Sequence, residues 1–377
     1  MSRTIARKVA VDLQSASWIR EMFEKGRRLK AERGADKVFD LSLGNPNAAP
    51  PKEYFDALQA VAAERRPELH RYMPNAGFDE TRAAVAAFLA DEYGIPFDGP
   101  SIIMTSGAAG GLSVAIHAIC NPGDEVIVLA PYFPDGFQPD LDAIAGAITS
   151  RTAAIIINTP NNPTGVVYSD ESCRGLAAVL AERDSADRPI YLLLDDPYRR
   201  IVYDAERSAS PASFYPRSIV ISSYSKDISI AGERAGYIAV PPDMPDRSLL
   251  LGAMTMLNRT LGFVNAGATT QRVLARCASA RCDLSLYRKN RDLLCDALTA
   301  SGYSFTRPGG ALYVFPKTPI PDDVAFVDLL VEQGVLTVPG RGFGWPGHIR
   351  VCYCVDHTTI EGALPGFKHA MQRAQSL

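Results

Sequence analysis

The chain has 377 residues, which is enough for a large hydrophobic core and for more than one domain. Hydrophobic residues make up 47% of it and charged residues 21%, and the formal net charge is -3, as in an ordinary soluble globular protein. This balance argues against a nucleic-acid partner or an anionic membrane surface, and no apolar stretch approaches the ~20 residues that a membrane span requires.

The amino terminus and the cysteines indicate a cytoplasmic protein. No apolar run follows the basic residues near the start of the chain, as it would in a secretory signal. The seven cysteines show no CxxC spacing and lie mostly in apolar segments, which is typical of reduced, buried thiols. The five histidines form no HxxxH or HExxH pattern, so we expect no catalytic metal.

The first predicted elements are a helix over residues 15–31 and a short apolar run over residues 38–43. From residue 102 onward, short runs that are apolar throughout alternate with helical stretches such as 111–119 and 169–181. The predicted strands are 102–105, 125–129, 153–158, 190–195, 218–223 and 237–240. Because strands without polar alternation need helices on both faces, this pattern predicts a mostly parallel α/β sheet.

The pattern changes after about residue 265. A long helical segment is predicted from Thr269 to about Ala300, and a closing helix ends the chain. Between them we expect a strand at 311–315, a helix near 323–333 and strands at 334–338 and 349–355. This mixture predicts a smaller α+β domain onto which the opening helix packs. The large domain would then span residues 46–265, and the small domain residues 1–45 and 266–377.

The stretch from Ser223 to Gly236 carries the strongest chemical signal. Lys226 follows the apolar run 218–222, so a strand buried on both faces delivers its amine into the protein interior. Such a lysine is suited to form an imine with an aldehyde, and nearby serines with Arg234 are suited to a phosphate. Pyridoxal 5'-phosphate (PLP) combines both groups. Taken alone, the segment fits equally well a lysine that caps a strand beside a serine-rich turn.

Ligands of open α/β sheets bind at the carboxyl edge of the strands, so the ends of the other predicted strands test this hypothesis. A glycine-rich turn at 105–111 leads from a strand into a helix, and its backbone N–H groups suit a phosphate. Asn162 lies in a turn fixed by two prolines and can offer its amide to a ligand oxygen, although such turns are common without a function.

Asp195 ends another apolar strand, where an unpaired buried carboxylate costs several kcal/mol. A pyridinium N–H would supply the missing partner, and Asp195 would keep that nitrogen protonated. Tyr198, three residues later, can donate a hydrogen bond to the ring hydroxyl or simply anchor the core. Four strand ends together therefore favour PLP more strongly than any one of them.

With these residues in place, the chain resembles the fold-type I PLP enzymes and, among them, the class I/II aminotransferases. The matching motifs are Asn162-Pro-Thr-Gly165, Asp195-x-x-Tyr198, Ser223-x-x-Lys226 and Arg234, in the family's order and spacing. The resemblance extends from Leu41-Ser-Leu-Gly-Asn-Pro to Gly347-His-Ile-Arg350-Val. It implies a mostly parallel, seven-stranded-type sheet between helices, and a smaller α+β domain.

The resemblance implies a set of cofactor contacts. The matching positions are Gly107, Ala108, Ala109, Phe133, Asn162, Asp195, Tyr198, Ser223, Ser225, Lys226, Arg234 and Tyr72. Residues 107–109 match the backbone that cradles the phosphate, and Phe133 matches the aromatic ring that stacks on the pyridine. Tyr72 matches a tyrosine that reaches the phosphate of the neighbouring subunit, which implies a homodimer with shared active sites.

The resemblance also implies the substrate contacts and the reaction. Arg350 matches the arginine that grips the substrate carboxylate, near Gly44 and Asn162, and the alternative is an exposed strand arginine paired with Asp356. Lys226 would hold PLP as an internal aldimine and then act as the base that moves the α-proton. The implied activity is transfer of an amino group between an L-amino acid and a 2-oxo acid.

The choice of substrate and the exact reaction stay open. Some aspartate aminotransferases carry a lysine where this chain has Ala109, and others a histidine where it has Gly136, so both markers of a dicarboxylate substrate are missing. Arg259 can reach a distal carboxylate from the partner subunit or serve as a surface arginine at a helix end. A lyase, decarboxylase or synthase reaction on the same fold, or a regulatory PLP-binding protein, are the alternatives.

Overall fold

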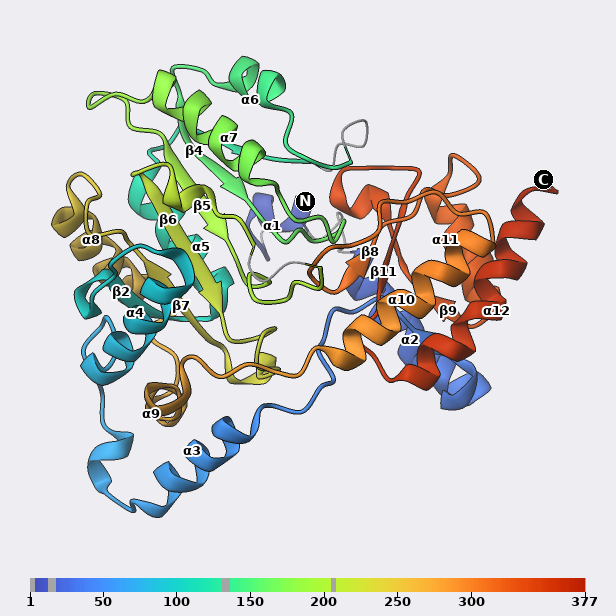
Figure 1. Cartoon of the computed structure of the whole chain (residues 1–377), viewed down its shortest axis with the longest axis horizontal. Helices are drawn as coiled ribbons and strands as arrows, with labels where there is room; N and C mark the ends of the chain where they lie inside the picture. The colour runs from blue at the N-terminus through green and yellow to red at the C-terminus, as the bar shows by residue number, and fades with distance from the viewer. Residues whose placement is uncertain (1–3, 13–17, 131–135, 205–207, 377) are drawn as a thin grey trace.

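A six-stranded sheet forms the centre of the larger of two bodies, on the left of Figure 1. The structure is a computed structural model and describes residues 4–12, 18–130, 136–204 and 208–376. The strands of this sheet are β2 Ile102–Ser106, β3 Glu125–Val128, β4 Thr152–Ile157, β5 Tyr191–Asp195, β6 Ser218–Ser223 and β7 Ala235–Ala239. Their order is β2-β7-β6-β5-β4-β3, with β3 to β6 parallel and β7 antiparallel to both neighbours.

The predicted α/β class with a mostly parallel sheet is confirmed. All six predicted strands form, and the ends of each lie within two residues of the prediction. The described residues contribute six strands to the sheet, one fewer than the seven-stranded type that the resemblance implied.

Helices cover both faces of this sheet, which explains why its strands lack polar alternation. Leu193 of β5 belongs to one apolar cluster together with Val114 and Met254, whereas Leu192 and Leu194 belong to a second cluster on the opposite face. The helices of the larger body are α3 Lys52–Ala63, α4 Asp79–Tyr93, α5 Gly107–Ile119, α6 Leu141–Ala147, α7 Asp170–Arg183, α8 Arg247–Thr260 and α9 Ala268–Cys277. Helices α5 and α8 supply the first cluster, and α3, α4, α7 and α9 supply the second.

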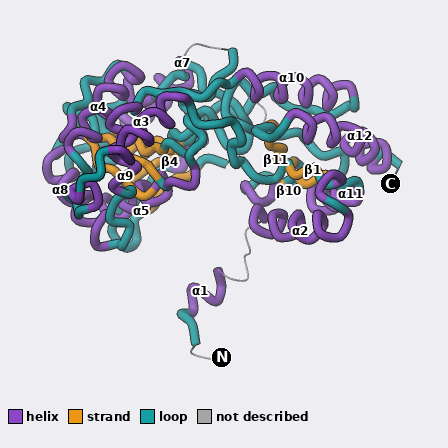
Figure 2. The backbone as a smooth tube through the Cα atoms, turned by 90° about the horizontal axis from the view of Figure 1, so that it is seen from below, coloured by secondary structure: helices purple, strands orange, loops and turns teal. Residues whose placement is uncertain are grey.

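The smaller body combines two short sheets with helices. The antiparallel sheet has the order β10-β11-β8, and β1 pairs in parallel with β9. These strands are β1 Phe39–Asp40, β8 Tyr313–Val314, β9 Val335–Leu336, β10 Val338–Pro339 and β11 Ile349–Cys352. Figure 2 shows the helices around them, namely α2 Trp18–Arg33, α10 Ser285–Ala300, α11 Asp323–Glu332 and α12 His357–Ala374. Helix α1 Arg7–Asp12 precedes them in the chain.

The single helical segment predicted from Thr269 to about Ala300 is wrong. Helix α9 ends at Cys277 and α10 begins at Ser285. The linker between them is held because the backbone N–H of Cys282 donates to the carbonyl of Asp227 (3.0 Å). The carboxylate of Asp283 accepts from the backbone N–H (2.8 Å) and the hydroxyl (2.7 Å) of Ser285, which fixes the start of α10.

The break between α9 and α10 affects where the large domain ends, which was predicted to be residue 265. Helix α9 packs against α3 and α4, and its apolar residues join the second cluster of the large sheet. Helix α10 packs against α12 in the smaller body. The division into residues 46–265 and 1–45 with 266–377 stays a prediction, and this packing favours a later second boundary, after Cys282.

None of the helices in the described ranges is both long and apolar enough to cross a membrane. The same ranges contain no group of three or more His, Cys, Asp or Glu side chains that could hold a metal ion.

Candidate active site

Lys226 lies in the loop that follows β6 and is half-buried. Its Nζ donates a hydrogen bond to the backbone carbonyl of Gly44, which comes from the loop after β1. Burial lowers the pKa of the Lys226 ammonium, against a smaller opposing effect of the Cys354 and Cys352 thiols. This shift increases the share of the neutral amine, which is the form that acts as nucleophile or base.

Asp195 closes β5, the strand next to β6 in the sheet. Its backbone carbonyl accepts from the side-chain amide of Asn158 (2.6 Å), whereas its carboxylate has no hydrogen-bond or ion-pair partner among the described residues. Burial and the neighbouring Asp196 raise the pKa of Asp195 to about 7. A cationic N–H donor beside this carboxylate would reverse that shift.

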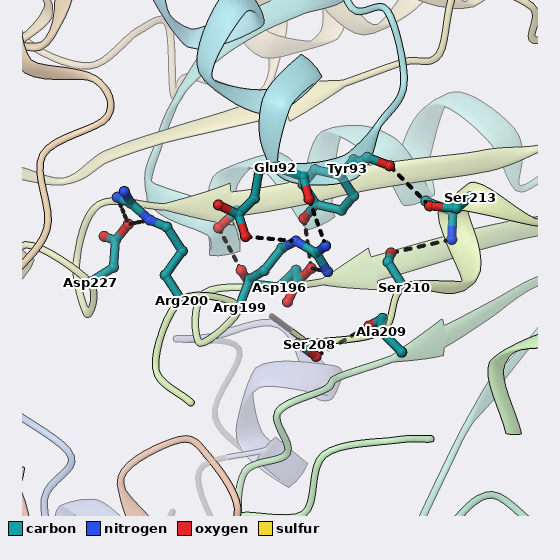
Figure 3. Close-up of polar contacts among 12 residues, drawn as sticks. Glu92, Tyr93, Asp196, Arg199, Arg200, Ser208, Ala209, Ser210, Ser213 and Asp227 are labelled. Atoms are coloured by element: carbon teal, nitrogen blue, oxygen red, sulfur yellow. Dashed lines mark hydrogen bonds and ion pairs between the residues drawn. The ribbon is translucent and has the colours of Figure 1, made fainter. Parts of the chain in front are cut away.

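Asp196 is fixed by a buried network of charged groups (Figure 3). The hydroxyl of Tyr93 donates to Oδ2 of Asp196 (2.6 Å), and Nη1 of Arg199 lies 3.9 Å from the same oxygen. Arg199 also donates from Nη2 to the backbone carbonyl of Glu92 (3.0 Å) and stacks on the Tyr93 ring at 3.9 Å. Burial still raises the pKa of Asp196 to about 6, although Arg199 and Tyr93 oppose it. The network therefore holds a carboxylate directly behind Asp195.

Arg350 lies on β11 and is only 2% exposed. Its Nη1 donates to Oδ1 of Asn162 (3.1 Å) and its Nη2 to the backbone carbonyl of Ser42 (2.6 Å). Within the described part of the chain it forms no ion pair, and its buried Nε has no hydrogen-bond partner. The alternative of an exposed arginine paired with Asp356 is wrong, because Asp356 instead accepts from Asn47 (2.8 Å).

Two aromatic rings enclose the Arg350 guanidinium. Its carbon lies 4.6 Å from the ring centre of Tyr313 and 4.7 Å from that of Phe343. The Tyr313 hydroxyl also shares a hydrogen bond of 2.9 Å with the hydroxyl of Tyr198, which is buried. Tyr313 packs so closely on Gly44 that a Cβ there would lie 1.8 Å from its hydroxyl. Tyr313 therefore connects Tyr198, Gly44 and Arg350.

The first turn of α5 faces Arg234. Gly107 has a φ of 71°, and a Cβ at this position would meet Nη2 of Arg234 at 2.5 Å. The backbone N–H groups of residues 107–109 begin the helix and have no carbonyl of a preceding turn to bond. Ser223 at the end of β6 and Ser225 are both buried. Helix start, arginine and hydroxyls form a donor set for a dianionic phosphate.

Two of the predicted site residues stand outside this arrangement. Tyr72 is fully exposed and lines a surface cavity of about 590 Å³ that also contains Arg259, at the end of α8. Lys226 and Arg234 do not line that cavity. Phe133 lies outside the described residues.

The residues present fit PLP in charge and in donor type. Asp195 is a half-buried carboxylate without a described cation, and Arg350 is a buried guanidinium without a described acid. Ser42, Tyr313, Phe343 and Asp196 belong to the same site and were not predicted. Asp196 and Tyr313 are visible in the sequence as polar residues within apolar segments, but nothing local to Phe343 indicates that it covers Arg350.

Comparison with known proteins agrees with this geometry. The family model described as aminotransferase class I and II matches residues 36–136 and 132–366. An aspartate/prephenate aminotransferase of Thermus thermophilus is 32% identical over 370 residues, which cover 91% of this chain and 93% of that protein. A probable aspartate aminotransferase of Methanocaldococcus jannaschii is 30% identical over 351 residues, 86% of this chain and 91% of its own length.

Solved structures match over almost the whole length. An amino transferase of Eubacterium rectale has a TM-score of 0.92 at 36% identity and covers 98% of this chain and 99% of its own. The aspartate aminotransferase of Thermus thermophilus with maleate has a TM-score of 0.85 at 29% identity, covering 98% and 100%. The chain therefore belongs to the class I and II aminotransferases, a family of PLP-dependent transferases.

Proposed function

We propose that this chain transfers the amino group of an L-amino acid to a 2-oxo acid with the help of PLP. One observation carries the proposal: Arg350 is a buried guanidinium with no acid among the described residues, and it shares a site with Lys226. A buried charge needs a partner, and the planar fork of an arginine is suited to a substrate carboxylate.

PLP, when bound, supplies an electron sink for the negative charge that develops on the α-carbon of the substrate. In this proposal the start of α5 (residues 107–109), Ser223, Ser225 and Arg234 hold its phosphate. Asp195 holds the ring nitrogen, and Asn162 and Tyr198 donate to the ring oxygen. Phe133 and a partner subunit's tyrosine at position 72 complete the contacts.

Lys226 is the residue that moves the proton. Because burial lowers the pKa of its ammonium, the neutral amine is more readily formed, and Nζ can accept the proton of the substrate α-carbon and return it later. Arg350 orients the substrate through its carboxylate, and Asn162 keeps the guanidinium in place through Oδ1. The hydrogen bond from Nζ to the carbonyl of Gly44 places the amine beside the loop that also contacts Arg350 through Ser42.

The exposed Tyr72 supports a homodimer with shared active sites. A tyrosine side chain without cover at a cavity of about 590 Å³ is an unusual feature for a monomer, and a partner subunit can occupy that cavity. The free cysteines support a cytoplasmic location.

The relatives named above suggest where to look for the substrate. Several are named for aspartate, and one for aspartate and prephenate. Ala109 and Gly136 of this chain lack the lysine and the histidine that the family resemblance associates with a dicarboxylate substrate. A panel of donors should therefore include aspartate and glutamate as well as aromatic and aliphatic amino acids.

The activity is tested by adding single amino acids, without an oxo acid, to the purified PLP-loaded protein. We expect the absorption of the cofactor to change to that of the pyridoxamine form, with one equivalent of 2-oxo acid produced per site. Release of ammonia or carbon dioxide instead would indicate another PLP reaction, and binding without chemistry would indicate a regulatory protein.

The lysine variants supply the matched control. Lys226→Ala should lose both turnover and the absorption band of the lysine-bound cofactor, whereas Lys289→Ala, on the exposed side of α10, should keep both. Amino transfer by Lys226→Ala at the wild-type rate would refute the assignment.

A further inference from the structure

Two cysteine sulfurs lie in contact beside the proposed substrate site. The Sγ atoms of Cys352 and Cys354 are 3.2 Å apart, and both side chains are fully buried. Cys352 ends β11, and its backbone N–H donates to the carbonyl of Leu41 (2.9 Å), just before the loop that contacts Lys226 and Arg350. Among the described residues no other two cysteine sulfurs are in contact.

Cys352 lies on the same strand as Arg350, and Cys354 follows two residues beyond the end of β11. Because side chains alternate along a strand, Arg350 and Cys352 point to the same side, and the 3.2 Å contact places the sulfur of Cys354 beside that of Cys352. Lys226 and Arg350 are close enough to Cys352 to stabilise a negative charge on its sulfur. The guanidinium of Arg350 therefore provides a positive charge near the Cys352 sulfur, as basic side chains do around reactive cysteines.

The two thiols are not equivalent. Burial acts against ionisation of Cys352, but the hydrogen bond from Cys354 together with Arg350 and Lys226 holds the pKa of the Cys352 thiol below its usual value. Burial and the neighbouring Cys352 raise the pKa of Cys354 well above its usual value. Cys352 is thus the more acidic of the two thiols, which suits it to the role of attacking cysteine, and Cys354 lies in contact with it as a resolving cysteine would.

We propose that Cys352 and Cys354 form a modification site at which a small peroxide produces an intramolecular disulfide. The Cys352 thiolate attacks one peroxide oxygen and breaks the O–O bond, which leaves a sulfenic acid and, after protonation, one water or alcohol. The thiol of Cys354 then attacks that sulfur, forms the S–S bond and releases a second molecule as water. Both sulfurs are oxidised and the two peroxide oxygens are reduced, and a dithiol reverses the reaction by exchange.

The disulfide would act on substrate binding through β11. A disulfide requires a separation of about 2.05 Å between the sulfurs, which is well below the 3.2 Å of the thiol pair. Closing that gap shifts the side chain of Cys352, which lies on β11 two residues from Arg350. We expect a loss of affinity for the substrate carboxylate, measured as a KM for the amino acid that rises more than kcat falls.

The test uses the PLP-loaded wild-type protein and hydrogen peroxide. After exposure, the protein is denatured in an alkylating reagent and digested with trypsin, which yields the peptide 351–368 with Cys352, Cys354 and no other cysteine. We expect this peptide to lose the mass of two hydrogen atoms and to escape alkylation, and a dithiol to restore both alkylation sites. The buried Cys295 of α10, which has no sulfur neighbour, should remain fully alkylated and is the matched control.

Two single variants test the order of events. In Cys354→Ser the reaction should stop at a sulfenic acid on Cys352 that a dione probe traps, and in Cys352→Ser position 354 should stay unmodified. Doubly alkylated peptide after peroxide treatment would overturn the proposal, as would oxidation only to sulfinic or sulfonic acid. The mass measurement does not depend on amino transfer, so its outcome and that of the proposed activity are separate.

Discussion

Nη1 of Arg350 donates a hydrogen bond of 3.1 Å to Oδ1 of Asn162, and this contact joins two motifs that lie 188 residues apart in the chain. The other nitrogen of the fork binds the carbonyl of Ser42, so the guanidinium is held from two sides before a substrate arrives. The position of Arg350 is therefore set by the fold and not by the substrate.

The Arg350→Lys variant should keep the positive charge but lose the planar guanidinium, whose two terminal nitrogens can bind both oxygens of a carboxylate. Since hydrogen bonds to charged groups contribute about 1.5–3 kcal/mol each, we expect kcat/KM for the amino acid to fall by about 10²-fold, mainly through KM. Steady-state kinetics with the best donor of the panel measures this. Arg27→Lys, at an exposed ion pair with Glu24 on α2, is the control and should leave kcat/KM unchanged. Equal kinetics of Arg350→Lys and wild type would contradict the carboxylate role.

The raised pKa of Asp195 predicts a pH dependence for the cofactor-free protein. The folded state holds a proton on Asp195 up to about pH 7, whereas an ordinary aspartate in the unfolded chain loses it near 3.8. The folded state is therefore favoured below that ordinary value, and this contribution disappears as the pH rises through about 7. Compared with Asp195→Asn, the wild-type protein should lose free energy of unfolding between about pH 4 and about pH 7.

Urea unfolding of both cofactor-free proteins at several pH values measures this difference. Asp196→Asn should reduce it, because the Asp196 carboxylate is one of the two causes of the raised pKa of Asp195. A difference between wild type and Asp195→Asn that does not change with pH would show that Asp195 is ionised in the folded state without any cofactor.

The hydrogen bond between Tyr198 and Tyr313 allows a test of whether Tyr198 contacts the cofactor or only packs in the core. Each hydroxyl is the partner of the other at 2.9 Å, so Tyr198→Phe and Tyr313→Phe remove the same bond and should each cost about 1 kcal/mol of stability. If Tyr198 also donates to the cofactor, Tyr198→Phe alone should raise the dissociation constant for PLP, by about tenfold. Fluorescence titration of the two cofactor-free variants with PLP gives the comparison. Equal affinities would leave Tyr198 with only its packing role.

The strands and the motif residues were predictable because their signals are local. Lys226 and Asp195 each end an apolar run, and a parallel sheet brings such ends to one edge. The contact of Tyr313 and Phe343 with Arg350 was not predictable, because it depends on how segments of the smaller body pack around one guanidinium. The end of α9 was missed for the same reason: the linker before α10 is fixed by the distant carbonyl of Asp227.

A Gly44→Ala variant tests the close packing of Tyr313 on Gly44, which the sequence did not predict. An alanine there would place its Cβ 1.8 Å from the hydroxyl of Tyr313, so the tyrosine or the loop after β1 must move. Overpacking of this kind costs about 1–3 kcal/mol, and Gly44→Ala should lower the free energy of unfolding by that amount. Because Tyr313 also packs on Arg350, the variant should raise KM for the amino acid as well.

Gly252→Ala is the matched control for that variant. Gly252 lies on the exposed side of α8, and a Cβ there has no heavy atom of another part of the chain within 4 Å. Alanine is the better helix former, so this variant should gain about 0.5–1 kcal/mol of stability with unchanged kinetics. If Gly44→Ala had the same free energy of unfolding and the same KM as Gly252→Ala, the loop after β1 would be able to move without cost. Gly44 would then have no part in holding Tyr313 against Arg350.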